Sequence, residues 1–161
     1  VPYAGSLVDS PLRHGIDSWV QHNPDADIGA ISHKAQQVTA SHLAFSLTAN
    51  GGRSPDRILL GGKAHCVGFA RVYCAVTGRL LERTGLEDRY RCQAGRGYVY
   101  FLGYNLHELN VGKHPSFRDH DFARIVDRRT GSQVLAADPS VYNYIYIDTV
   151  HGLTSPAPRG R

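Results

Sequence analysis

Three residues of the chain could act together in nucleophilic catalysis. Cys66 ends the stretch Gly61-Gly62-Lys63-Ala64-His65-Cys66, and His120 and Asp138 lie further along the chain. A thiolate can attack a carbonyl carbon, an imidazole can move the proton, and a carboxylate can orient the imidazole. If the fold brings them together, these residue types predict thiol-dependent acyl transfer.

The element that must position Cys66 is a helix. Residues from Cys66 to about Arg83 are compatible with a helix, and Gly85 is a typical stop. At a helix start, unpaired backbone N–H groups and the positive end of the helix dipole favour a thiolate. The same N–H groups can receive the oxyanion that forms when a carbonyl is attacked.

A β-hairpin is the element that could bring His120 and Asp138 together. If residues 127–131 form its loop, Val126 pairs with Ser132. His120 and Asp138 lie equally far from that pair, so this register places them opposite one another with Cβ atoms about 5 Å apart. A different register would make their relation diagonal or put them on opposite faces.

Periodicity predicts helices before Cys66 and strands after it. A turn is expected from Ser54 to Asp56, and glycine and asparagine at 50–52 close the second helix. The predicted fold is α+β, with N-terminal helices and the Cys66 helix packed on an antiparallel sheet, in one domain over 1–153 with a disordered tail over 154–161. Helices are expected over 12–20, 31–47 and 66–83, and strands over 89–92, 97–104, 106–111, 119–126, 132–137 and 142–147.

Composition restricts the function classes. The chain has 161 residues, 42% hydrophobic and 20% charged, with a net charge of +4, as a single soluble domain has. No apolar run approaches the roughly 20 residues that cross a bilayer. Basic residues are scattered, with no run longer than Arg128-Arg129, so no nucleic-acid partner is expected. The missing initiator Met predicts a processed start, which favours an extracytoplasmic location.

The three cysteines leave at least one thiol free or intermolecular. Cys74 and Cys92 are interpreted as packed thiols, and a Cys74–Cys92 disulfide in an oxidising compartment is the alternative. Either arrangement leaves Cys66 as a thiol. Packing alone is a further interpretation of Cys66, but it does not account for the glycines before that residue.

Taken together, the order of these motifs resembles the transglutaminase-like superfamily of papain-like cysteine enzymes. The matching residues are Gly61 to Ala70, Asp119-His120-Asp121-Phe122 and Ala137-Asp138-Pro139, within about residues 55 to 145. The resemblance implies catalytic Cys66, His120 and Asp138, a thioester intermediate, a peptide or protein amide substrate and no cofactor. Hydrolases are common among the small members.

Two departures from the family pattern bear on the site. An aromatic residue often follows the histidine in the family, whereas Asp121 stands there and Phe122 comes next. Papain-type proteases complete their oxyanion hole with a glutamine shortly before the cysteine, but Gln36 and Gln37 lie about thirty residues upstream. The second oxyanion donor is therefore unassigned.

Other sites are weaker interpretations. The spacing of His107, His114 and His120, with Asp119 and Asp121, matches no compact zinc motif, so no metal is expected. The alternating tyrosines over 98–104 and 142–146 could form a stacking platform, although sheet packing explains them as well. The alternative function is a non-catalytic peptide- or glycan-binding module on the same fold.

Overall fold

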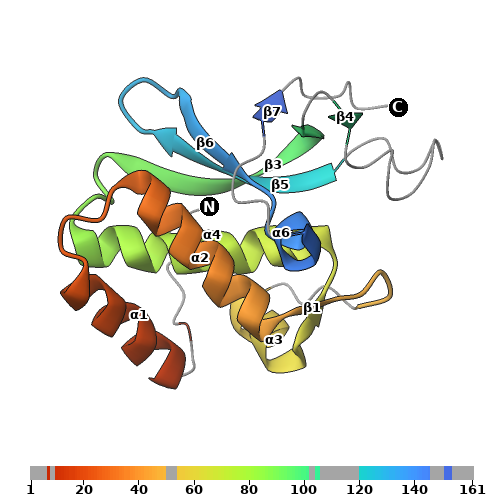
Figure 1. The fold of residues 1–161 in the computed structure, drawn as a ribbon, viewed down its shortest axis with the longest axis horizontal. Helices are drawn as coiled ribbons and strands as arrows, with labels where there is room; N and C mark the ends of the chain where they lie inside the picture. The colour runs from red at the N-terminus through yellow and green to blue at the C-terminus, as the bar shows by residue number, and fades with distance from the viewer. Residues whose placement is uncertain are drawn as a thin grey trace.

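Helices and an antiparallel sheet make the described part of the chain an α+β fold (Figure 1). The computed structural model describes residues 7, 10–49, 54–101, 104–105, 120–145 and 151–153. The predicted strand over 106–111 and the predicted tail over 154–161 lie outside these residues. None of the helices in this part of the chain is long and apolar enough to cross a membrane.

The first two helices are α1, Ser10–His22, and α2, Ile28–His42. The side chain of Asp27 caps α2 by accepting a hydrogen bond from the Ala30 N–H at 2.8 Å. The prediction that this helix runs to residue 47 is wrong. The chain leaves the helix after His42 because β1, Ala44–Phe45, pairs in parallel with β2, Lys63–Ala64.

Helix α3, Pro55–Gly61, stands where the sequence predicts only a turn. The Ser54 hydroxyl caps its start by accepting a hydrogen bond from the Arg57 N–H at 3.3 Å, and a proline in the first turn suits a helix. Gly62 ends the helix with a φ of 62°, a left-handed conformation that glycine adopts without strain.

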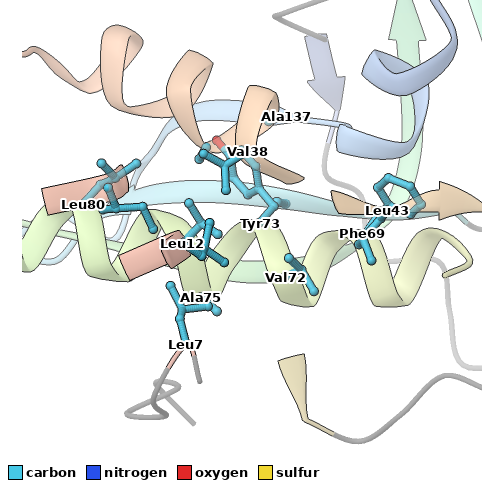
Figure 2. Packing of buried hydrophobic residues seen from close by; sticks show 14 of the residues in the cluster. Leu7, Leu12, Val38, Leu43, Phe69, Val72, Tyr73, Ala75, Leu80 and Ala137 are labelled. Carbon is cyan, nitrogen blue, oxygen red and sulfur yellow. The ribbon is translucent and has the colours of Figure 1, made fainter. Parts of the chain in front are cut away.

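Helix α4, Cys66–Thr84, begins at the predicted residue and ends at Gly85, whose φ is 71°. It lies between the other helices and the sheet, in contact with α1, α2, α3, β3 and β5 (Figure 1). Figure 2 shows the apolar cluster around it, with Leu12 of α1 and Val38 of α2 close to α4. Each fully buried large side chain, such as Phe69 or Leu80, contributes about 1.5–3 kcal/mol through loss of apolar contact with water.

Three strands form the body of the sheet: β3, Tyr90–Phe101, β5, His120–Asp127, and β6, Gln133–Ala137. The short strands β4, Tyr104–Asn105, and β7, His151–Leu153, pair with β3. All these pairings are antiparallel.

Strand β3 is continuous where the sequence predicts two strands, because β5 pairs with it without interruption from Tyr90–Asp127 to Gly97–His120. Position 95 of this strand favours glycine, because a Cβ there would lie only 3.1 Å from the Phe122 ring. Helix α6, Pro139–Ile145, follows β6, so the prediction of a strand over 142–147 is also wrong.

Candidate active site

The segment before Cys66 is held on two sides. The Ala44 N–H donates to the Gly62 carbonyl at 2.9 Å, and the Ser46 N–H donates to the Ala64 carbonyl at 2.8 Å. On the helix side, a Cβ on Gly68 would lie 2.7 Å from the Ala64 Cβ, which is too close for a side chain. Gly68 thus lets the first turn of α4 pack directly on β2, and Cys66 sits half-buried at the start of that turn.

His120 and Asp138 form a buried hydrogen-bonded pair. The His120 Nε2 lies 2.5 Å from the Asp138 Oδ2, with 8% of the histidine and 1% of the aspartate exposed. Removing a carboxylate from water at this depth is costly unless it is paired, and the imidazole is its charged partner.

The predicted contact is present, but the predicted register is wrong. Val126 pairs with Gln133 rather than Ser132, and the register shifts between Ile125 and Val126. Beyond that bulge Ala123 pairs with Ala137, so Asp138 follows the end of the ladder and comes level with Phe122 rather than His120. The two side chains therefore meet in a diagonal relation, which long side chains can span.

The second carboxylate oxygen of Asp138 is held by the start of α6. Its Oδ1 accepts from the Ser140 hydroxyl at 2.6 Å, the Ser140 N–H at 3.1 Å and the Val141 N–H at 3.2 Å. The Asp138 carbonyl accepts the first helical bond, from the Tyr142 N–H at 2.9 Å. Asp138 is thus the N-cap of α6 and the partner of His120 at once.

Cys66 is the other group that interacts with His120, and this interaction raises the pKa of the imidazole. Nε2 of the imidazole contacts Asp138, and Nδ1 is its other, buried ring nitrogen. The three residues thus form one series of interactions, from the start of α4, through the start of β5, to the residue that follows β6.

His120 and Asp138 each stabilise the charged form of the other. Burial alone lowers the pKa of His120, but the charge and hydrogen bond of Asp138, followed by those of Cys66, outweigh it and raise the pKa to about 10. Burial alone raises the pKa of Asp138. The charge and hydrogen bond of His120 and the hydrogen bonds from Ser140 and Val141 outweigh burial, so the pKa of Asp138 lies below its usual value. At neutral pH the pair is therefore an imidazolium and a carboxylate.

The other two cysteines are joined in a disulfide. Cys74 of α4 is bonded to Cys92 of β3, with their Cα atoms 5.1 Å apart, and Cys66 is the free cysteine. This is the second of the two arrangements that the sequence left open. The bond ties the helix that begins at Cys66 to the strand that pairs with the strand of His120.

Of the residues considered for metal binding, only His120 and Asp121 belong to the described part of the chain. His107, His114 and Asp119 lie outside it. Among the residues that the structure describes, no group of three or more His, Cys, Asp or Glu side chains could hold a metal ion. His33 instead has its ring edge against Tyr142, with centroids 6.3 Å apart, so it links α2 to α6.

Comparisons of the chain with protein-family models, with curated proteins and with solved structures gave no match. The geometry of the site and the sequence motifs are therefore the observations on which a function can be argued.

Sequence reasoning missed Ser140, which holds the carboxylate of Asp138. The signal was present in Asp138-Pro139, because an aspartate followed by proline is a typical helix start. The alternating tyrosines after it favoured a strand, and that pattern concealed the cap.

Proposed function

We propose that this chain is a thiol-dependent acyl-transfer enzyme of the transglutaminase-like type, acting on a peptide or protein amide. The observation that carries the proposal is the buried His120–Asp138 pair, whose imidazole also interacts with the free cysteine Cys66. A helix that begins at the cysteine and packs on an antiparallel sheet agrees with a papain-like core.

Each residue has one role in the proposed reaction. The Cys66 sulfur attacks the carbonyl carbon of a carboxamide or peptide bond, while the backbone N–H groups at the start of α4 receive the oxyanion. The C–N bond then breaks, and protonated His120 gives its proton to the departing nitrogen. Asp138 keeps the imidazole in orientation and stabilises its charge.

The second half of the reaction restores the enzyme. Neutral His120 takes a proton from water or from an amine, whose oxygen or nitrogen attacks the thioester carbon. The C–S bond breaks, and Cys66 leaves as a thiolate beside the reprotonated imidazole. Water gives a carboxylic acid and an amine gives a new amide, and we favour hydrolysis as the proposed outcome.

Alkylation of native protein tests the nucleophile. With Cys74 and Cys92 in a disulfide, iodoacetamide should label Cys66 alone, at neutral pH at least about tenfold faster than it labels a small thiol such as glutathione. A rate no faster than that of glutathione would contradict the proposal. His120→Ala is the matched variant, and its Cys66 should react more slowly.

Trapping the acyl-enzyme tests the reaction. Mass spectrometry after incubation with a library of peptide acyl donors should find a thioester on Cys66, and the trapped acyl group identifies the substrate class. Cys66→Ala should abolish amidase activity while leaving the free energy of unfolding close to that of the wild type. A Cys66→Ala protein that keeps full biological activity would instead support the non-catalytic binding module.

A further inference from the structure

We propose that Ser140 is the positioning residue of this site, fixing the Asp138 carboxylate so that its other oxygen meets His120. The inference rests on the proposed function for its catalytic meaning, while the contacts that carry it are independent of any substrate. Ser140 lies directly after Pro139 and is 4% exposed.

The Ser140 hydroxyl adds a third donor to the two that the helix start supplies. An N-cap carboxylate normally accepts from the N–H groups of the second and third residues of its helix, which here are Ser140 and Val141. The N–H groups of Ser140 and Val141 reach Oδ1 at 3.1 and 3.2 Å, and the Ser140 hydroxyl is the shortest contact at 2.6 Å. Hydrogen bonds to an ionised acceptor are the strong ones, so this contact contributes most to holding the carboxylate.

Fixing one oxygen fixes the other. A carboxylate is planar, so an Oδ1 held by three donors leaves Oδ2 in a single position, 2.5 Å from His120 Nε2. Without the hydroxyl, Oδ1 of Asp138 is held by the two longer backbone contacts, and the imidazole loses part of its support. Since Asp138 and Cys66 are the groups that raise the pKa of His120, a displaced carboxylate lowers that pKa.

Helix α6 itself is anchored from elsewhere in the fold. It packs against α2 and α4, and the Tyr142 ring meets the His33 ring edge-on. The packing of α6 on α2 and α4 therefore determines the position of Ser140. Through its hydrogen bond to Asp138, Ser140 in turn determines where that carboxylate meets His120.

The test compares two serine-to-alanine substitutions of equal chemistry. Ser140→Ala removes the hydroxyl from Asp138. Ser32→Ala removes a buried hydroxyl that forms an equally short hydrogen bond, 2.6 Å, with the Tyr73 hydroxyl between α2 and α4. Trimethylamine N-oxide is added to every protein, because it strengthens apolar burial and keeps both variants folded.

Two measurements distinguish a role of Ser140 in positioning Asp138 from a general effect on the stability of the fold. The first is the NMR titration of the His120 ring, identified among the nine histidines by its loss in His120→Gln. The second is the pH profile of Cys66 alkylation. Ser140→Ala should lower the pKa of His120 and slow alkylation at pH 7 by roughly tenfold, whereas Ser32→Ala should leave both as in the wild type.

Ser140→Thr keeps a hydroxyl and should restore both readouts. A folded Ser140→Ala protein with the wild-type His120 titration would overturn the proposal, as would equal effects of Ser32→Ala. The His120 titration needs no substrate. If wild-type Cys66 is unreactive yet Ser140→Ala still lowers the pKa of His120, the positioning role stands and the acyl-transfer function fails.

Discussion

Cys74 in the middle of α4 is bonded to Cys92 near the start of β3. Strand β3 in turn pairs with β5 along Tyr90 to Gly97, and the last of these residues faces His120. The helix that carries the candidate nucleophile and the sheet that carries the candidate base are thus covalently tied, in addition to their packing.

Removing that disulfide should destabilise the fold. The bond closes a loop between residues 18 apart in sequence, and loops of this size contribute about 3 kcal/mol by restricting the unfolded chain. The Cys74→Ala, Cys92→Ala double variant should lose about that much free energy of unfolding in urea. Dithiothreitol should reproduce the loss in the wild type and change nothing in the double variant, and an unchanged wild-type midpoint would count against the prediction.

Asp138→Asn should remove most of the reactivity of the site. The amide can still cap α6 but carries no charge, so the pKa of His120 falls and the imidazole loses its orientation. Amide hydrolysis should drop on the order of 10²–10⁴-fold. Asp127→Asn is the matched control in the same hairpin, because that carboxylate accepts from the Arg129 and Thr130 N–H groups of the turn and pairs with Arg89, away from His120. Equal losses in the two variants would contradict the prediction.

Stability should fall as the pH rises from about 6.5 to about 10. The pKa of His120 is near 6.5 in an unfolded chain and about 10 in the fold, where it faces Asp138 and Cys66. The folded state therefore binds the proton more tightly than the unfolded chain does. The resulting stabilisation is fully present below pH 6.5 and is lost as the pH rises through the pKa of His120 in the folded state. Urea unfolding at a series of pH values should show this decline in the wild type.

His120→Gln is the control for that pH dependence, since glutamine does not titrate. Its free energy of unfolding should decline less over the same range, and parallel curves for the two proteins would exclude His120 as the cause. At the acid end, Asp138 acts with the opposite sign. Its pKa is lowered by folding, so its contribution is present above about pH 4 and lost as the pH falls through the folded pKa.

Gly68→Ala should displace the start of α4. The new Cβ would stand 2.7 Å from the Ala64 Cβ, and such overpacking costs about 1–3 kcal/mol. Cys66 alkylation should slow as the helix start moves away from β2. Gly78→Ala, in the same helix and with nothing within 4 Å of the added Cβ, should instead stabilise the fold by about 0.5–1 kcal/mol. Similar unfolding free energies for the two variants would refute the close-approach argument.

Local signals in the sequence were enough to predict several elements. The limits of α4 follow from residues adjacent to them, a glycine-rich lead-in before Cys66 and Gly85 after the last turn. The hairpin that carries His120 and Asp138 follows from two apolar runs around a polar turn, and the contact between these residues was expected from it. Caps and periodicity are properties of neighbouring residues, so a single chain suffices to read them.

Other features were decided only in the tertiary structure. Helix α2 stops at His42 because β2, about twenty residues later, offers Ala44 a partner. Between Ile125 and Val126 the register shifts, and Val134 falls between two paired positions, which the loop length alone did not show. The alternating tyrosines after Asp138 predict a strand, yet that carboxylate caps a helix there.

The amino-acid sequence by itself determined which residues could do chemistry and that Cys66 begins a helix. Only the tertiary structure decided how Asp138 reaches His120, which cysteines pair, and that Ser140 holds the carboxylate in place. The physical reason is that pairing partners far apart in sequence compete for the same backbone and side-chain groups. Local propensity is too weak to determine the outcome of that competition.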